Sequence, residues 1–121
     1  MALTKTTPAD QTGTSLASST AFTGAGIQAY YGVSGVVKLT NAGSGMSGAP
    51  YVYMDFSHDS ATWKLGPAIG VGDNVNSSVN YVPFSAGIGS LGDFTYVRIR
   101  VTSNTGGDVT VAVSYAVTTG L

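Results

Sequence analysis

Residues 51–65 read Y-V-Y-M-D-F-S-H-D-S-A-T-W-K-L, and this stretch decides the predicted fold. Its first seven residues alternate in side-chain type, as in a β-strand with one buried face. The apolar face holds Val52, Met54 and Phe56, and the other face holds Tyr51, Tyr53, Asp55 and Ser57. Residues 57–60 have turn chemistry, because Ser and Asp side chains hydrogen-bond nearby backbone groups. The chain then resumes at Trp63, so the stretch predicts a β-hairpin with one buried face.

The composition indicates one all-β domain. The chain has 121 residues, a length typical of a single domain. Seventeen glycines and many valines, threonines and tyrosines favour strands, while the strong helix former Glu is absent. Cysteine is also absent, which excludes disulfides and thiolate sites. Apolar runs are too short for a membrane-spanning helix, and the N-terminus lacks the apolar core of a signal peptide. Synthesis in a host cytoplasm and no membrane partner are therefore expected.

The charge content is unusually low. Only 9% of residues are charged, against roughly 25% in ordinary globular proteins. The net charge of −1 gives no electrostatic basis for binding nucleic acid. A freely diffusing monomer usually carries more charge for solubility. A surface of Ser, Thr, Asn and Gly is more typical of a chain inside an assembly, or of one outside a cell. The assembly is favoured over a free monomer, and an oligomer is expected.

Further strands are predicted along the chain. The main ones are 27–40, 79–84, 94–102 and 109–117. Gly32 and Gly35 predict a bend that divides the first of these into two strands. Pro83 predicts that the second lies at a sheet edge or that the proline lies at a strand end, since proline cannot donate to a sheet ladder. The last two are expected to form an antiparallel hairpin. About seven or eight short strands separated by turns predict a single antiparallel, immunoglobulin-like Greek-key β-sandwich.

This topology also predicts one contact. In a Greek-key sandwich, the strand that begins at Tyr51 lies beside 94–102. Asp55 would then share an outer face with Arg98 and Arg100. An ion pair is expected there, worth at most about 1 kcal/mol if it is exposed.

Residues 1–14 are polar, rich in threonine and interrupted by Pro8. They are interpreted as an extended N-terminal arm, either frayed or added to a neighbouring subunit. The sandwich domain is assigned to residues 15–121.

Several segments carry a resemblance to a known group of proteins. T-Y-V-R-I-R-V-T-S-N-T-G-G (95–107), followed by V-T-V-A-V (109–113), resembles the last hairpin of immunoglobulin-like and fibronectin-type sandwiches. Tyr96 is out of phase with the inward residues, so no tyrosine corner is expected. The succession of K-L-T-N-A-G (38–43), F-S-H-D-S-A-T-W (56–63) and N-T-G-G-D-V-T-V (104–111) resembles the small immunoglobulin-like virion proteins of tailed bacteriophages. The resemblance covers residues 15–118 and implies a capsid decoration or tail-associated protein.

Candidate catalytic and metal-binding residues are few. Ser57, His58 and Asp59 are consecutive, and neighbours along a strand end point in different directions, so they do not predict a catalytic triad. His58 with Asp55 and Asp59 offers a weak set of metal ligands. The loop residues Asp73, Asn74 and Asn76 likewise offer oxygen ligands to calcium. Neither matches the calcium-loop signature, and turn chemistry explains both groups better. No catalytic residue, cofactor or metal is predicted.

Outward aromatic residues are the main indication of binding. Tyr30, Tyr51, Tyr53 and Tyr96 fall on outward faces, with Trp63 near in sequence. Tyr and Trp are enriched at protein interfaces, and the same rings can stack on sugars. The predicted function is a non-enzymatic virion protein that decorates or cements a bacteriophage capsid through protein contacts. The predicted contact residues are Leu3, Tyr51, Tyr53 and Trp63. The alternative is a carbohydrate- or receptor-binding module at a virion or cell surface.

Overall fold

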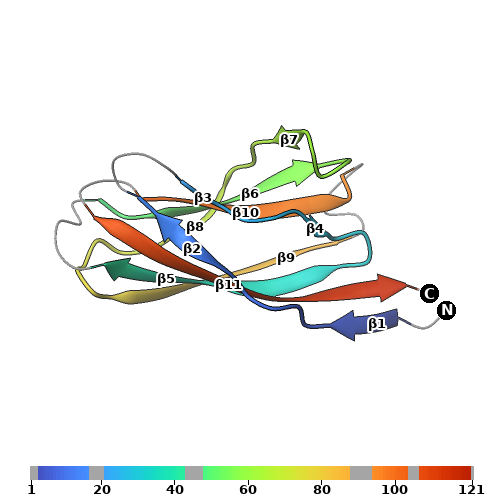
Figure 1. Ribbon diagram of the computed structural model, residues 1–121, viewed down its shortest axis with the longest axis horizontal. Coiled ribbons are helices and arrows are strands. Elements are labelled where there is room, and N and C mark those ends of the chain that lie inside the picture. The colour runs from blue at the N-terminus through green and yellow to red at the C-terminus, as the bar shows by residue number, and fades with distance from the viewer. Residues whose placement is uncertain (1–2, 17–20, 43–47, 88–93, 104–106, 121) are drawn as a thin grey trace.

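The computed structural model describes residues 3–16, 21–42, 48–87, 94–103 and 107–120, and these form two packed antiparallel sheets (Figure 1). The first, called here the β5 sheet, contains β1 (Leu3–Thr6), β2 (Gln11–Ser15), β5 (Val33–Ala42), β9 (Val79–Ala86) and β11 (Asp108–Gly120). The second, the β6 sheet, contains β3 (Phe22–Thr23), β4 (Ile27–Gln28), β6 (Tyr51–Ser57), β7 (Trp63–Lys64), β8 (Ala68–Val71) and β10 (Tyr96–Thr102). The predicted all-β sandwich is confirmed.

The core lies between the sheets and follows the predicted alternation. Every second residue of β10 and of the first half of β11 points inward and is fully buried: Val97, Ile99, Val101, Val109, Val111 and Val113. Val52 and Met54 of β6 are also buried, and Phe56 packs against the core from its rim. Each fully buried aliphatic side chain contributes roughly 1.5–3 kcal/mol.

The strand order is that of a jelly roll. In the β5 sheet, β11 lies between β5 and the β1–β2 edge, and β9 forms the opposite edge. In the β6 sheet, β10 lies between β6 and the short strands β3 and β4, and β7 and β8 pair with the far side of β6. The chain crosses between sheets after β2, β4, β5, β8, β9 and β10. The short strands share positions: β1 and β2 both pair with β11, β3 and β4 with β10, and β7 and β8 with β6. Each sheet therefore has four strand positions, and the two sheets together have the eight of a jelly roll.

The predicted final hairpin is wrong. β10 pairs with β3, β4 and β6, whereas β11 pairs with β1, β2 and β5. In immunoglobulin-like domains the last two strands share a sheet, so the connectivity differs from the predicted one. The inward-facing valines of β10 and β11 are buried equally well whether the two strands lie in one sheet or face each other across the core. The alternation therefore could not distinguish these two arrangements. The tip of the predicted turn, residues 104–106, lies outside the described residues, as does Gly43 of the 38–43 motif.

The predicted division of 27–40 is confirmed at Gly32. This glycine has φ +138°, a conformation that L side chains rarely adopt. The chain leaves the β6 sheet at β4 and enters the β5 sheet at β5. The crossing turns Tyr31 outward and leaves it 38% exposed, whereas Val33, two residues later, is buried.

The segment predicted as an arm contains two strands from Leu3 onward. β2 pairs with Val109–Val113 of β11, and β1 pairs with the last four residues of that strand. Together with the two-residue strands, they bring the described strand segments to eleven, more than predicted. All four β1 residues are exposed, and Figure 1 shows β1 beside both chain ends at one end of the sandwich. The boundary between arm and domain stays a prediction.

The predicted hairpin of residues 51–65 is confirmed by the pairing of β6 with β7. The turn is held by side chains that the sequence indicated. Ser57 Oγ donates to the Thr62 carbonyl at 2.6 Å and accepts the Ser60 amide at 2.9 Å. Asp59 Oδ1 accepts the amides of Ala61 and Thr62, each at 2.9 Å. These bonds assign Ser57 and Asp59 to the turn.

Candidate functional site

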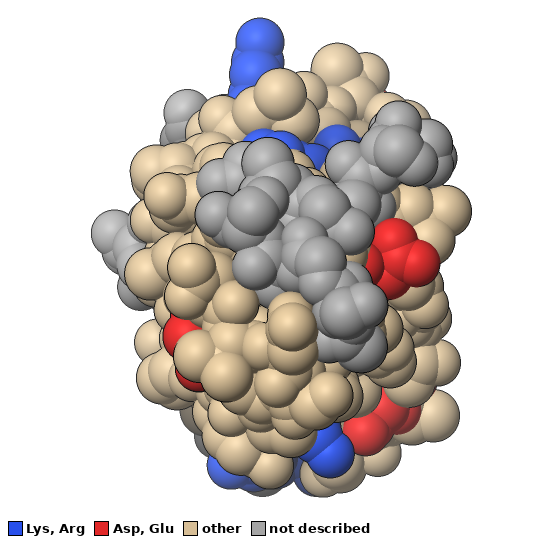
Figure 2. Space-filling view, turned by 90° about the vertical axis from the view of Figure 1, so that its left-hand side faces the viewer, with Lys and Arg blue, Asp and Glu red and all other residues tan. Residues whose placement is uncertain are grey.

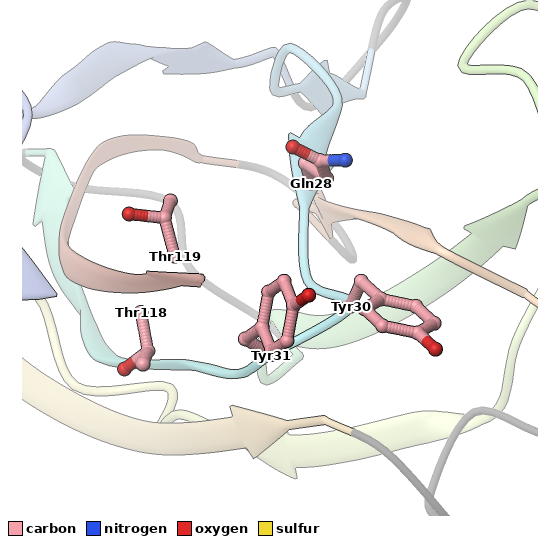
Figure 3. A pocket seen from close by; sticks show the side chains of 5 residues that line it. All are labelled: Gln28, Tyr30, Tyr31, Thr118 and Thr119. Carbon is pink, nitrogen blue, oxygen red and sulfur yellow. The ribbon is translucent and has the colours of Figure 1, made fainter. Parts of the chain in front are cut away.

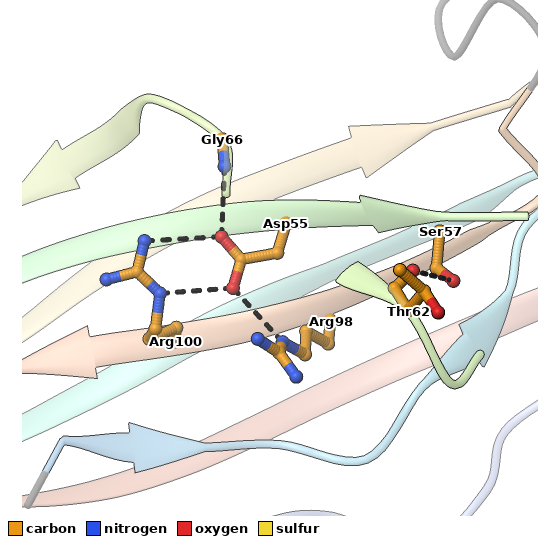
Figure 4. A network of polar contacts seen from close by, with 6 residues as sticks. All are labelled: Asp55, Ser57, Thr62, Gly66, Arg98 and Arg100. Carbon is orange, nitrogen blue, oxygen red and sulfur yellow. Dashed lines mark hydrogen bonds and ion pairs between the residues drawn. The ribbon is translucent and has the colours of Figure 1, made fainter. Parts of the chain in front are cut away.

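Asp55 is the centre of a polar cluster on the outer face of the β6 sheet (Figure 4). β6 and β10 pair in the register that places Asp55 opposite Arg98 and next to Arg100, as predicted. Oδ2 accepts Arg98 Nε at 3.1 Å and Arg100 Nε at 3.0 Å. Oδ1 accepts Arg100 Nη2 at 3.2 Å and the Gly66 amide at 3.0 Å. The predicted ion pair is confirmed.

The burial of Asp55 was not predicted. Its side chain is 0% exposed, while those of Arg98 and Arg100 are 19% and 18% exposed. The chain after β7 returns over Asp55 at Gly66, where a Cβ atom would lie only 1.8 Å from the Met54 carbonyl oxygen. Only glycine fits this close approach. The limit of about 1 kcal/mol for a surface pair therefore does not apply.

The pKa of Asp55 is lowered by its partners. Burial by itself would raise the pKa, but hydrogen bonds from Arg100, the Gly66 amide and Arg98 outweigh that effect. The pKa of Asp59 is lowered by the Thr62 and Ala61 amides. The pKa of Asp73 is lowered by the Ser78 hydroxyl and the Val75 amide.

These shifts predict a loss of stability in acid. A carboxyl group with a lower pKa in the folded state stabilises the fold above its unfolded pKa of about 3.9. That contribution disappears as the pH falls through the folded pKa. Thermal unfolding midpoints measured from neutral pH downward should therefore fall below about pH 4. Asp55→Asn should show a shallower fall than wild type, and an equally steep one would contradict the assignment to Asp55.

Aromatic rings flank both arginines. The Arg98 guanidinium lies 4.5 Å from the centre of the Trp63 ring, and that of Arg100 lies 4.2 Å from the centre of the Tyr53 ring. Tyr51 continues the row, with its ring centre 6.4 Å from that of Tyr53. Such cation–π contacts contribute roughly 0.5–2 kcal/mol each. The row, called here the arginine–aromatic cluster, stiffens the sheet's outer face and occupies one side of two rings.

Three of the predicted contact residues come together, and one does not. Tyr51, Tyr53 and Trp63 belong to the arginine–aromatic cluster; Tyr51 is 36% exposed and the other two are half-buried. Leu3 is 59% exposed on β1, in the other sheet. Whether these residues contact a partner stays a prediction.

His58 lies in the turn and is exposed, as predicted. Its ring stacks on Phe94 with a centre-to-centre distance of 4.5 Å. The Thr95 hydroxyl donates to the His58 carbonyl at 3.3 Å. These contacts tie the turn to the chain that enters β10.

The loop around Asp73 converges on the side chain of Asn41. Asn41 is 1% exposed, and its Nδ2 lies 3.0 Å and 2.8 Å from the carbonyl oxygens of Asp73 and Val75. It also lies 3.2 Å from both Asp73 Oδ1 and Ser78 Oγ. The side-chain amide of Asn41 therefore occupies the position among these oxygens where a calcium ion would have to bind. Among the described residues, no group of three or more His, Cys, Asp or Glu side chains could hold a metal ion.

The outer face of the β5 sheet is broad and nearly uncharged. Its outward positions include Thr12, Thr14, Ser34, Val36, Lys38, Thr40, Val79, Tyr81, Pro83, Thr110, Ala112 and Ser114. Lys38 carries the only charge among the positions named above. By the same register, Lys5 on β1 and Asp108 at the start of β11 also have outward parity, near the two ends of the sheet. Tyr81 is 63% exposed and Val79 is 44% exposed. Figure 2 shows that charged side chains are also sparse on the described surface at one end of the sandwich.

A small cavity at the end of β11 was missed by sequence reasoning. It is lined by Gln28, Tyr30, Tyr31, Thr118 and Thr119 (Figure 3). Tyr30 was predicted to point outward and is 49% exposed. The neighbouring Gly32 was the one signal that could have placed Tyr31 at the surface, because it interrupts the alternation of the strand pattern.

The fold and its surfaces define a jelly-roll domain with a sparsely charged sheet face. The described chain contains no helix that could span a membrane. No protein-family model matches the chain, and a search of curated proteins gives no match.

Solved structures of infectious bursal disease virus have a similar fold. A chain of the Gx strain matches with a TM-score of 0.56 and 15% identity, over 98% of this chain and 32% of that one. A chain of the Gt strain gives 0.57 and 15%, over 97% and 32%. The VP2 subviral particle gives 0.50 and 17%, over 97% and 32%. The chain thus spans about a third of the length of these viral proteins. At this identity the likeness shows a shared fold.

Proposed function

We propose that this chain is a non-enzymatic structural protein of a virion. In its finer form, the proposal is that the chain decorates or cements a bacteriophage capsid as an oligomer. The fold it shares with proteins of a virus particle supports the virion role. Its low charge supports a place inside an assembly.

The outer face of the β5 sheet is the observation that carries the proposal. Interface cores are depleted in charged residues and enriched in Tyr. This face presents Tyr81, Val79 and Pro83 beside rows of Thr, Ser and Ala. A partner surface could cover the centre of this face while desolvating only one charged side chain, Lys38. In a symmetric assembly the same weak contact would be repeated many times, and the repeated contacts together would give strong overall binding.

The test is incorporation into particles. Virions purified from a culture that produces this chain should contain it at a constant ratio to the main shell protein, measured by quantitative mass spectrometry. Tyr81→Asp should abolish incorporation, because the interface would have to desolvate a carboxylate. Val75→Asp changes a loop residue that is 57% exposed and should incorporate normally. The chain's absence from wild-type particles, or normal incorporation of Tyr81→Asp, would contradict the proposal.

The arm is proposed to reach a neighbouring subunit through β1. Its four residues bury no side chain. Besides backbone hydrogen bonds, it is held to its own β11 by two long, exposed threonine contacts, from Thr119 Oγ1 to the Thr4 carbonyl at 3.3 Å and from Thr6 Oγ1 to the Val117 carbonyl at 3.5 Å. An equivalent β11 in another copy offers the same bonds, which makes exchange of the strand inexpensive. A truncation that tests the arm must end before Gln11, where β2 begins. Removing β2 as well would take away the strand that pairs with Val109–Val113 of β11.

Paired cysteines can show which copy receives β1. Thr4 and Thr119 are directly opposite in the β1–β11 ladder, and the chain has no native cysteine. In the assembled protein, Thr4→Cys with Thr119→Cys should oxidise to covalent multimers, seen on a non-reducing gel. Thr4→Cys alone should give no such ladder. Covalently closed monomers alone would show that β1 stays on its own chain, without touching the virion role.

A further inference from the structure

The cavity at the end of β11 is a formed site with a mixed aromatic and polar lining. Its volume is about 120 Å³. Gln28 comes from β4, Tyr30 and Tyr31 from the crossing between sheets, and Thr118 and Thr119 from β11 (Figure 3). Figure 3 shows Tyr31 between Tyr30 and the two threonines, with its ring reaching toward Gln28. Segments far apart in sequence therefore build one site.

The backbone around the two tyrosines is held on both sides. The Ala29 amide donates to the Thr95 carbonyl at 2.7 Å, and Ala29 is fully buried. The Thr118 amide donates to the Gly32 carbonyl at 2.8 Å. A ligand would therefore meet a site whose backbone is already ordered, and ordering costs little on binding.

Neither Tyr30 nor Tyr31 is part of the hydrophobic core. Tyr30 and Tyr31 are 49% and 38% exposed, and their rings meet edge to face with centres 4.9 Å apart. Exposed aromatic rings provide an apolar surface, and their hydroxyls provide a polar end. The C–H face of a pyranose ring matches this combination.

The polar lining selects for a neutral ligand. It consists of an amide, two threonine hydroxyls and the tyrosine hydroxyls, and no lining residue is charged. These groups can donate to and accept from the hydroxyls of a sugar. A carboxylate or phosphate would find no cation among them. By contrast, Trp63 and Tyr53 each have a cationic guanidinium against the ring.

We propose that this cavity, the tyrosine pocket, binds a single neutral hexose unit of a glycan. Its volume is below the roughly 300–1,000 Å³ typical of pockets for drug-sized ligands, so one sugar unit is the fitting size. The dissociation constant is expected on the order of millimolar. Many copies on one particle would raise the avidity for a glycan-coated surface. The pocket goes beyond the structural role proposed above and does not depend on it.

Saturation-transfer NMR tests the proposal with the full chain. Glucose, galactose, mannose and N-acetylglucosamine are each added alone, and at least one should receive saturation from the protein. Tyr31→Ala should weaken that sugar's binding about tenfold, through loss of the stacking surface. Gln28→Ala, a change at an exposed side chain, should also weaken it. Leu65→Ala removes an apolar side chain that is 71% exposed and does not line the pocket, and it should leave binding unchanged.

Each other result overturns the proposal. Transfer to none of the four sugars would do so, as would unchanged binding by folded Tyr31→Ala and Gln28→Ala. An equal loss in Leu65→Ala would show non-specific contact with exposed apolar side chains. Tyr31→Ala should still be incorporated into virions normally, because the tyrosine pocket is separate from the outer face of the β5 sheet.

Discussion

Asp55→Ala is expected to lower the free energy of unfolding by about 3–5 kcal/mol. The substitution leaves two arginines beside each other on β10, both more than four-fifths buried, with no carboxylate between them. It also leaves the Gly66 amide without its acceptor. Breaking a buried ion pair on one side is costly because the remaining charge stays desolvated. Since small domains are stable by roughly 5–15 kcal/mol, much of the native stability would be lost.

Urea unfolding followed by tryptophan fluorescence measures this change, because Trp63 stacks on Arg98. Asp55→Asn keeps the shape and one acceptor oxygen, so its loss should be smaller than that of Asp55→Ala. Asp10→Ala changes an exposed residue and serves as the control. A loss below about 1 kcal/mol for Asp55→Ala would mean that the pair behaves like a surface salt bridge.

Asn41→Ala is expected to lower the free energy of unfolding by about 2–3 kcal/mol. The Asn41 Nδ2 group is the common donor for oxygens of Asp73, Val75 and Ser78. Within the described residues its Oδ1 has no hydrogen-bond partner, so the donor side provides the stabilisation. Removing the amide leaves these acceptors facing an empty space in the protein. Asn41→Asp should be worse, because it puts a carboxylate beside Asp73.

Urea unfolding of the two Asn41 variants gives the overall loss, and hydrogen exchange at the Val75 and Ser78 amides reports on the loop itself. The Val75 amide donates to Asp73 Oδ1, and that of Ser78 donates to the Val75 carbonyl. Both should exchange faster in Asn41→Ala. Asn74→Ala, in the same loop but exposed, should be close to wild type. If Asn41→Asp proved as stable as wild type, the amide would not be acting as the donor.

The sequence was sufficient for features that depend on local pattern. Alternation identified the inward faces of β6, β10 and β11, because successive side chains of a strand point to opposite sides. The turn after Ser57 followed from side chains that bond their own backbone. The edge position of Pro83 on β9 followed from its missing amide hydrogen.

The candidate sites were only partly accessible from the sequence. The pairing of Asp55 with two arginines could be predicted, because a Greek-key neighbourhood places β6 beside β10 and alternation puts Asp55, Arg98 and Arg100 on the outer face. The burial of Asp55 could not, since it depends on the return of the chain at Gly66 and on the arginines lying over it. The tyrosine pocket was inaccessible for a similar reason. It needs Thr118 and Thr119, which lie about 90 positions from Tyr31 in the sequence.

Thus the sequence alone determined that this protein is an antiparallel β-sandwich with a nearly uncharged surface, and which face of each long strand is buried. Only the tertiary structure decided which sheet each strand joins. A period of two residues specifies a face but not a partner, so β10 and β11 looked like a hairpin while lying in opposite sheets. Partner choice depends on all the long-range contacts that form together, and those contacts made the chain a jelly roll.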